Sequence, residues 1–308
     1  MSKTVLITGV AGFIGRYAAR SFSKNGWEVT GVDVVSPENA PLSNLKAYFS
    51  LNLPDPEIDR ILKDNTPDVC IHCAGRASVG LSISDPSSDF YDGAVLTFEL
   101  LNALRQFAPA CKFIFLSSAA VYGNPETLPV TEIQPTNPIS PYGFHKLICE
   151  QLCREFYQVY GLPTAVVRIF SAYGPGLHRQ VIWDICRKAL TLNTVKLQGT
   201  GKESRDFIHA ADIANALLVV ARSSPMKGDV YNLASGKEVT IKALVDIILR
   251  QCGRESSEVF DGIIPDGTPS NWVADISKIR KLGFSPSISL EEGVKFFVDW
   301  CIAELKGV

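Results

Sequence analysis

Short apolar segments alternate with longer amphipathic segments along the first half of the chain. Five segments rich in β-branched residues are predicted strands, at 5–8, 28–33, 69–72, 113–117 and 164–170. Four amphipathic segments are predicted helices, at 13–25, 57–65, 95–107 and 142–160. This alternation predicts an α/β fold in which helices cover both faces of a parallel sheet.

The pattern changes after about residue 171. Gly174-Pro175-Gly176 interrupts it, and short helices mixed with loops are expected in the remainder. A helix is expected at 212–222, and a strand at 230–233 could rejoin the first sheet. We therefore expect a cofactor-binding domain at 1–170 plus about 205–234. A smaller, interleaved α/β domain would comprise about 171–204 plus 235–308.

The composition is that of an ordinary soluble protein. Of 308 residues, 46% are hydrophobic and 20% are charged, and the net charge of −2 disfavours a nucleic-acid binder. No apolar run approaches the roughly 18 residues of a membrane span, and no signal peptide is evident. We expect a cytoplasmic protein with reduced cysteines and no metal site. Cys70 and Cys73 form a CxxC that we attribute to core packing.

A glycine-rich segment, Thr-Gly-Val-Ala-Gly-Phe-Ile-Gly at 8–15, follows the first predicted strand and opens the first predicted helix. In that context Gly9 permits a tight turn, Gly12 lets the backbone approach a pyrophosphate, and Gly15 allows close packing of helix on strand. The free N–H groups of the helix N-terminus, where Phe13 and Ile14 lie, favour phosphate. The segment predicts a dinucleotide-binding loop.

The choice between the two nicotinamide cofactors depends on Asp33, which ends the predicted strand at 28–33. A carboxylate there can accept hydrogen bonds from both ribose hydroxyls. Val34 and Val35 follow it, whereas a site for NADP would normally have a basic residue. The sequence therefore favours NAD.

Tyr142 and Lys146 are one helical turn apart, so in a helix they share a face. Ser140 is a good N-cap and Pro141 suits the first helical position. A phenol, with a pKa of about 10, is a poor base at neutral pH, and a neighbouring cation favours its ionised form. The pair could exchange a proton with a hydroxyl group, although such pairs also occur by chance on exposed helices.

Together these motifs resemble those of the extended short-chain dehydrogenases/reductases, the nucleotide-sugar epimerase/dehydratase group. Further motifs match in order along nearly the whole chain: Asn52-Leu53, His72-Cys73-Ala74-Gly75, Ser117-Ser118-Ala119-Ala120-Val121-Tyr122-Gly123, 168–176 and 205–209. The resemblance implies a Rossmann-type doubly wound parallel sheet with a smaller interleaved α/β substrate domain. It also implies NAD as cofactor and a nucleotide-diphosphate sugar as substrate.

The resemblance assigns a role to each matching residue. Ser118 hydrogen-bonds the reacting hydroxyl, Tyr142 is the acid/base, and Lys146 binds the nicotinamide ribose and assists ionisation of Tyr142. The cofactor residues beyond the glycine loop and Asp33 are Asn52, Leu53, Cys73, Ala74, Gly75, Ser117, Tyr142, Lys146 and Phe170. The substrate residues are Ser118, Ser171, Arg205 and Trp272.

Two alanines exclude some of the reactions that this group of enzymes catalyses. The 4,6-dehydratases of this group carry Asp-Glu where this chain has Ala119 and Ala120, and GDP-fucose-synthase-like enzymes place a Cys at the second position. Epimerisation at C4 or reduction of a ketosugar remains. The segment 74–82 is close to the AGxxxVGxS loop of UDP-galactose 4-epimerases, which favours epimerisation. In that cycle Tyr142 takes the 4-hydroxyl proton as hydride passes to NAD; the 4-ketosugar rotates, and hydride returns to its other face.

Several positions depart from the family pattern. Ser171 and Gly93 each replace a usual Asn, and Pro265 or Asp266 stands where an arginine is expected. Arg205 remains the best diphosphate ligand, because it is permanently charged and bidentate.

Three further positions were left open by the sequence. His178 or Arg179 could compensate for the missing arginine, although Arg179 could equally be a surface cation. Trp272 aligns with the position that limits sugar size in 4-epimerases. It would disfavour an N-acetylated sugar, unless it is a core residue.

The leading hypothesis is a 4-epimerase that retains NAD through turnover. A 4-ketosugar reductase that consumes NAD(P)H is the alternative. A non-catalytic NAD sensor is a third, which would have no need of Ser118, Tyr142 and Lys146. Helices 95–107 and 144–160 pair across the dimer in this family. Both carry apolar residues on more than the one face that would pack on the sheet. We therefore expect a homodimer, although burial within one subunit explains these residues nearly as well.

Overall fold

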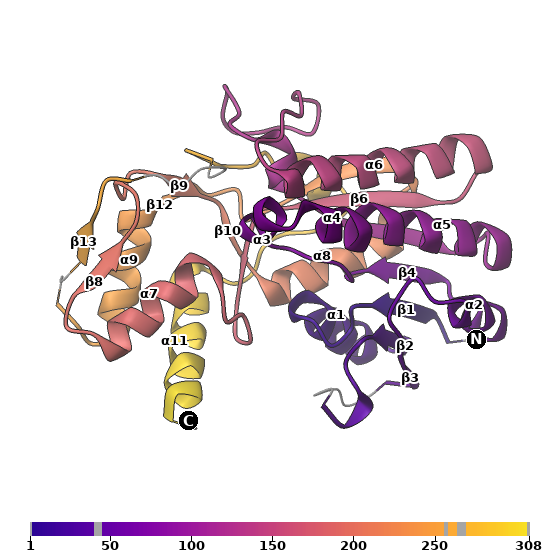
Figure 1. Ribbon diagram of the computed structural model, residues 1–308, viewed down its shortest axis with the longest axis horizontal. Coiled ribbons are helices and arrows are strands. Elements are labelled where there is room, and N and C mark those ends of the chain that lie inside the picture. The colour runs from indigo at the N-terminus through magenta and orange to yellow at the C-terminus, as the bar shows by residue number, and fades with distance from the viewer. Residues whose placement is uncertain (1, 40–44, 256–257, 264–268, 307–308) are drawn as a thin grey trace.

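The computed structural model describes residues 2–39, 45–255, 258–263 and 269–306. Its centre is a parallel sheet of seven strands in the order β11-β6-β5-β4-β1-β2-β3 (Figure 1). The strands are β1 (Thr4–Thr8), β2 (Glu28–Asp33), β3 (Ala47–Ser50), β4 (Val69–His72), β5 (Lys112–Ser118), β6 (Thr164–Ile169) and β11 (Lys227–Leu233). The order reverses between β1 and β4, and a crevice forms at the carboxyl ends of strands at such a point.

Both faces of the sheet are buried, as the alternation of strands and helices predicts. Val5 and Ile7 of β1 pack into one hydrophobic cluster and Leu6 into the other, because successive side chains of a strand point to opposite faces. The first cluster includes residues of α1 (Phe13–Lys24) and α8 (Ala210–Ser223). The second includes residues of α2 (Glu57–Asn65), α5 (Leu96–Phe107) and α6 (Pro141–Tyr160).

The helix that carries Tyr142 begins where its sequence predicts. The Ser140 hydroxyl accepts a hydrogen bond from the backbone N–H of Gly143, Pro141 occupies the first turn, and Gly161 ends α6 with φ of 73°. The predicted strand at 230–233 is also present; it extends to Lys227–Leu233 and joins the sheet beside β6. The Rossmann-type fold is thereby confirmed.

Some elements were not predicted. β3 is a short strand at the sheet edge with a mostly half-buried pattern, so it lacks the apolar signal of a central strand. Between β4 and α5 lie α3 (Val79–Ser84), α4 (Pro86–Phe90) and a π-helical turn (Tyr91–Val95). The side chains of Ser78 and Asp85 cap α3 and α4, so polar residues interrupt what would otherwise be a continuous helical pattern.

The second region has its own hydrophobic cluster, which lies to one side of the sheet (Figure 1). It is built mainly on α7 (Gln180–Thr191), α9 (Ile241–Gln251) and α11 (Leu290–Lys306). The expectation of only short helices was wrong, because α11 has 17 residues. The proposed boundaries of a substrate-binding domain at 171–204 plus 235–308 stay a prediction.

Short strand pairs complete the second region. β7 (Ser171–Tyr173) pairs with β10 (Phe207–His209), β9 (Ser204–Arg205) with β12 (Val239–Thr240), and β8 (Val195–Leu197) with β13 (Glu258–Phe260). α10 (Ser277–Arg280) packs near β11. The first two pairs bring the chain back to the carboxyl ends of the sheet strands. Within the described ranges, no helix combines the length and apolarity needed to cross a membrane.

Candidate active site

Two adjoining cavities open at the carboxyl ends of the sheet strands. One, of about 460 Å³, lies beside β2 and is lined by Asp33, Asn52 and Leu53. The other, of about 690 Å³, lies between the sheet and the second region and is lined by Ser118, Tyr142 and Lys146 among others. The two share residues of the glycine loop and of 73–76. Their joint shape suits an elongated ligand that extends from β2 to the second region.

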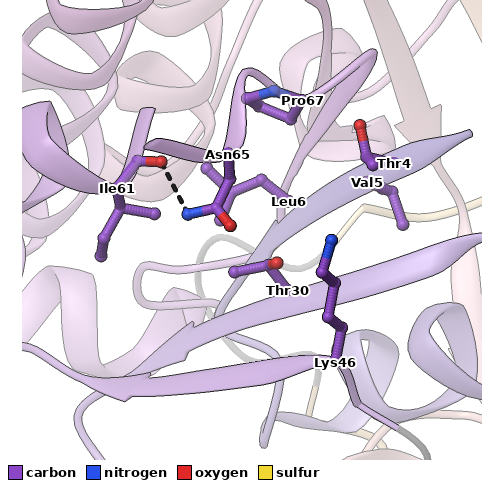
Figure 2. A pocket seen from close by; sticks show the side chains of 8 residues that line it. All are labelled: Thr4, Val5, Leu6, Thr30, Lys46, Ile61, Asn65 and Pro67. Carbon is purple, nitrogen blue, oxygen red and sulfur yellow. Dashed lines mark hydrogen bonds between the residues drawn. The ribbon is translucent and has the colours of Figure 1, made fainter. Parts of the chain in front are cut away.

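A third, much smaller pocket lies away from these cavities, among β1, β2 and α2 (Figure 2). Its volume is about 10 Å³, and the Asn65 side chain at its wall donates a hydrogen bond to the carbonyl of Ile61 at 2.9 Å. A space of this size holds roughly one water molecule. It is therefore no candidate for a ligand site.

The glycine loop has the backbone geometry that its sequence predicts. Gly9 has φ of +66°, and a Cβ there would lie 2.6 Å from the backbone nitrogen of Ala74. A Cβ on Gly15 would lie 2.1 Å from the carbonyl oxygen of Gly9, so only glycine allows α1 to pack this closely. Gly12 is the N-cap of α1, and no side chain caps this end. The helix N-terminus is thus open to the larger cavity, which Phe13 and Ile14 also line.

The Asp33 carboxylate is held at the end of β2 by the same loop. One oxygen accepts a hydrogen bond from the backbone N–H of Ala11 at 2.9 Å, and the other from that of Val35 at 3.2 Å. Val34 and Val35 line the smaller cavity beside it. A fixed carboxylate next to two apolar side chains suits a ribose with free hydroxyls better than one that carries a phosphate.

Ser118, Tyr142 and Lys146 meet in the larger cavity. Lys146 Nζ lies 5.8 Å from the Tyr142 ring centroid and donates a hydrogen bond to the carbonyl of Leu116 at 2.9 Å. Ser118 ends β5, and its Oγ accepts a hydrogen bond from the backbone N–H of Ala120 at 3.2 Å. The backbone N–H of Tyr142 donates to Ser82 Oγ at 3.0 Å, which ties the start of α6 to α3. Because the Ser118 oxygen accepts from Ala120, the hydroxyl proton of Ser118 is left for another acceptor.

A buried polar network adjoins the elements that carry Ser118 and Tyr142, and the sequence did not predict it. Ser117 Oγ donates to Glu150 at 2.5 Å, and Glu150 also accepts from Arg168 at 2.6 Å. Arg168 donates to the Tyr122 hydroxyl at 2.8 Å, which donates in turn to Asn232 at 2.7 Å. Burial raises the pKa of Tyr122 to about 12, so its phenol stays protonated. Burial opposes the charge of Arg168, but its bonds to Glu150 prevail and raise its pKa.

Two other cavity residues are held in their neutral forms. His72 is buried beside Thr8, with 2.7 Å between Nδ1 and Oγ1, and burial together with the Lys146 charge lowers its pKa to about 3. Burial raises the pKa of the Cys73 thiol to about 12. Neither group is therefore an acid or base near neutral pH. Cys70 is fully buried, and Cys73 packs against the core while it also lines both cavities.

The far end of the larger cavity carries Arg205 and Trp272. Arg205 donates to the carbonyls of Ser204 and Ser270 at 2.7 and 3.2 Å, and its guanidinium lies 5.6 Å from the Trp272 ring centroid. The indole N–H of Trp272 donates to the carbonyl of Gly123 at 3.0 Å, which fixes the ring. Burial lowers the pKa of Arg205 to about 10, against the charge of Glu203. Arg205 has no ion-pair partner in the described parts of the chain.

Each residue that the sequence assigned to cofactor or substrate lines one of the two cavities. The residues in the larger cavity include Gly9, Gly12, Phe13, Ile14, Gly15, Cys73, Ala74, Gly75, Ser117, Ser118, Tyr142, Lys146, Phe170, Ser171, Arg205 and Trp272. Those in the smaller one include Asp33, Asn52 and Leu53. Their individual roles stay predictions. Pro265 and Asp266 lie outside the described residues.

Arg76, Arg179 and Gln180 also line the cavities, and of these the sequence had raised only Arg179, as one of two candidates for the missing arginine. Arg76 lines both cavities and is paired with Asp92 at 2.7 Å and Asp85 at 3.0 Å. Arg179 and Gln180, which precede and begin α7, line the larger cavity. Gly93 lies in the π-helical turn, where an added Cβ would only touch His145 at 4.0 Å. All eight cysteines are free, and the described residues contain no group of side chains that could hold a metal ion.

Comparison with known proteins is consistent with this geometry. Residues 5–234 match the NAD dependent epimerase/dehydratase family. The UDP-N-acetylglucosamine 4-epimerase from Methanobrevibacter ruminantium M1, solved in complex with UDP-N-acetylmuramic acid, is 30% identical with a TM-score of 0.88. The UDP-glucose 4-epimerase from Thermotoga maritima, solved with UDP-glucose, is 28% identical with a TM-score of 0.90.

A third solved structure is the UDP-glucuronic acid 4-epimerase from Bacillus cereus, in complex with UDP-glucuronic acid and NAD. It is 25% identical to this chain, with a TM-score of 0.89. All three similarities cover 98% of this chain and 99% of the other. All three proteins are named as 4-epimerases, and the sugars in their names differ.

Proposed function

The chain belongs to the NAD-dependent epimerase/dehydratase family, and from this premise we propose that it is a nucleotide-sugar 4-epimerase that retains NAD through turnover. One observation carries the proposal. No aspartate or glutamate is among the described residues that line the larger cavity, whereas Ser118, Tyr142 and Lys146 all line it. Elimination of water from a sugar needs a further acid or base, and His72 and Cys73 are held neutral. Hydride transfer coupled to one proton transfer fits this set of groups.

The residues present fit a bound NAD. The open N-terminus of α1 would hold the pyrophosphate, Asp33 the adenosine ribose, Leu53 the adenine, and Lys146 the nicotinamide ribose. Once bound, NAD supplies the acceptor and donor of a hydride at C4 of the sugar. Both cavities are needed for a molecule of this length, and their shared residues lie at the glycine loop.

The chain's own part in the reaction is to move one proton and to hold the sugar. The Ser118 hydroxyl would donate a hydrogen bond to the 4-oxygen, because its own oxygen already accepts from Ala120. The Tyr142 phenol would take the 4-hydroxyl proton and return it later, with the Lys146 ammonium one turn away on the same side of α6. The 4-ketosugar must turn over in the cavity between these two proton transfers.

Arg205 and Trp272 would bind the substrate beyond the reacting carbon. A half-buried guanidinium that pairs with no carboxylate of the described residues favours an anionic ligand, here the diphosphate. The Trp272 ring, fixed by its bond to Gly123, forms a rigid wall that would disfavour an N-acetylated sugar. Ser171 would contact the sugar or phosphate from β7.

The proposal is tested with purified full-length protein and no added NADH. UDP-, GDP-, CDP- and dTDP-hexoses, and UDP-glucuronate, are incubated with it and followed by proton NMR. We expect one of these nucleotide sugars to be converted to its C4 epimer, and tightly bound NAD to be released on denaturation. Conversion of none of them would overturn the proposal. Consumption of added NAD(P)H with a nucleotide 4-ketosugar, without epimerisation, would instead assign a 4-ketosugar reductase.

We further propose that the protein is a homodimer that pairs through α5 and α6. Both helices expose large apolar side chains that α3 and α4 do not cover. On α5 this is Phe98 at 40% exposure, and on α6 Phe144 at 53%, Ile148 at 40% and Tyr160 at 50%. α5 and α6 pack against each other along one side of the sheet (Figure 1). A second copy would bury these side chains against its own two helices.

A further inference from the structure

The segment 174–180 forms part of the rim of the larger cavity. Its backbone is left-handed at three positions, with φ of +148° at Gly174, +95° at Gly176 and +68° at Gln180. A non-glycine residue in this region costs on the order of 1–3 kcal/mol, and it persists only where the surroundings impose it. The result of this path is that Arg179 and Gln180 line the cavity.

Arg179 reaches across the cavity opening. Its guanidinium donates a hydrogen bond to the carbonyl of Ala77, in the loop that follows β4 on the opposite rim. A carbonyl is a neutral acceptor, and no carboxylate pairs with Arg179 in the described parts of the chain. Arg76, in the same loop, is instead neutralised by Asp85 and Asp92.

The neighbouring residue His178 points elsewhere. Its ring centroid lies 4.9 Å from that of Trp183 and 4.8 Å from that of Trp300, and its Nε2 is 3.0 Å from a Glu304 oxygen. His178 does not line either cavity among the described residues. Of the two side chains that could replace the missing arginine, only Arg179 is therefore in place to do so.

The larger cavity thus has two arginines that pair with no carboxylate in the described ranges. Arg205 belongs to β9 and Arg179 directly precedes α7, and both side chains line the larger cavity. The open N-terminus of α1 already provides for one pyrophosphate, that of the cofactor. Two further unpaired guanidinium groups call for a second multiply charged group in the same cavity.

We infer that Arg179 and Arg205 bind the diphosphate of the nucleotide-sugar substrate together, and that Arg179 replaces the arginine that the family pattern places near 265–266. This inference rests on the proposed function. Arg179 would exchange its bond to the Ala77 carbonyl for bonds to phosphate oxygens. The guanidinium is charged in both bonds, but a phosphate adds an opposite charge and can accept from two of its N–H groups at once, so the exchange favours binding.

The test measures binding alone, by calorimetry on NAD-saturated full-length protein. UDP, GDP, CDP and dTDP are titrated first to find the tightest nucleoside diphosphate, and then the corresponding monophosphate is titrated. For Arg179→Ala we expect roughly tenfold weaker binding of the diphosphate, about 1.4 kcal/mol. Binding of the monophosphate should weaken less than threefold, and Arg179→Lys should restore part of the loss.

Two variants serve as controls. Arg187→Ala removes the same charge from α7, where Arg187 is near Asp184 and outside both cavities. His178→Gln alters the residue next to Arg179. Both should bind the nucleoside diphosphate as the wild type does.

Unchanged diphosphate affinity of Arg179→Ala would overturn the inference. UDP-glucuronate is titrated as well, and a loss confined to it, with UDP unaffected, would also overturn the inference, because the arginine would then recognise a sugar carboxylate. Failure of the wild type to bind any of the four diphosphates would contradict the proposed function instead, so the two failures are distinguishable.

Discussion

The hydroxyl groups of Ser118 and Tyr142 line a cavity in which no described carboxylate is present. At the scale of the residue, this makes Tyr142 the expected proton carrier. Tyr142→Phe removes only the hydroxyl, so kcat for epimerisation should fall about 10²- to 10⁴-fold while KM changes little. NMR assay of the converted nucleotide sugar measures both.

Tyr91→Phe is the matched control for this variant. Tyr91 is 53% exposed and lies outside both cavities, so its variant should keep wild-type kcat. If Tyr142→Phe retained more than a tenth of the wild-type kcat, another group would have to carry the proton. A cellular function that survives Tyr142→Phe intact would favour the non-catalytic NAD sensor.

A second prediction concerns His72, which is buried neutral beneath the glycine loop. Its pKa is about 3 in the folded protein and about 6.5 in the unfolded chain. Between these values the unfolded state binds more protons, so stability falls as the pH falls below about 6.5. From pH 7.5 to 5.5, His72 alone should lower the free energy of unfolding by about 1.4 kcal/mol.

Urea unfolding at the two pH values measures this loss. Burial also lowers the pKa of His209, which adds to the loss in the same direction. An NMR titration of the ring protons assigns the effect to the residue. A His72 resonance that titrated near pH 6.5 in the folded protein would contradict the prediction.

At the scale of the element, the relative placement of Ser118, Tyr142 and Lys146 depends on how α6 is aligned along β5. Lys146 bonds to the Leu116 carbonyl, and one turn later Glu150 bonds to Ser117. Arg168 of β6 holds Glu150 in turn, so bonds among three elements fix where α6, which carries Tyr142, lies against β5, which carries Ser118. Small displacements of reacting groups are costly, since about 1 Å can reduce a rate about 100-fold.

Ser117→Ala tests this arrangement without leaving Arg168 unpaired. We expect stability to fall by about 1.5–3 kcal/mol, because the lost bond is to a charged group. We also expect kcat to fall about tenfold at nearly constant KM. Steady-state kinetics and urea unfolding on the same preparation separate the two effects.

Ser224→Ala is its control, since Ser224 is also buried and bonds to Tyr231 at 3.0 Å, away from both cavities. It should lose stability and keep kcat. Equal kcat in the two variants would show that the Ser117 bond stabilises the fold without positioning Tyr142 and Lys146.

At the scale of the whole molecule, the outer surfaces of α5 and α6 predict the oligomeric state. Light scattering after size exclusion should give twice the chain mass of 33.6 kDa. Phe144→Glu places a charge among the exposed apolar side chains of α6 and should shift the mass towards one chain. Val259→Glu, at a 54% exposed position on β13, should leave the mass unchanged. A monomeric wild type would contradict the dimer.

Much of the sheet was predictable because central strands and their covering helices carry strong local patterns. β3 was missed because an edge strand that is only half-buried needs no apolar run. The short helices α3 and α4 were missed because Ser78 and Asp85 cap them in quick succession. α11 was underestimated although Val294, Phe297, Val298 and Cys301 recur at helical spacing, so its signal was present in the sequence.

The sequence by itself determined what depends on neighbours along the chain. The turn at Gly9, the close packing at Gly15, the cap at Ser140 and the one-turn spacing of Tyr142 and Lys146 are all short-range features. Backbone sterics and helix geometry decide them, so spacing alone is informative.

Only the tertiary structure decided what depends on residues far apart in the chain. It joined Ser117, Glu150 and Arg168 into one buried network, and it turned His178 away from the cavity while Arg179 lines it. It also left the described part of the larger cavity without a carboxylate. The physical reason is that burial, and with it the cost of an unpaired charge, is set by how distant segments pack and not by local spacing.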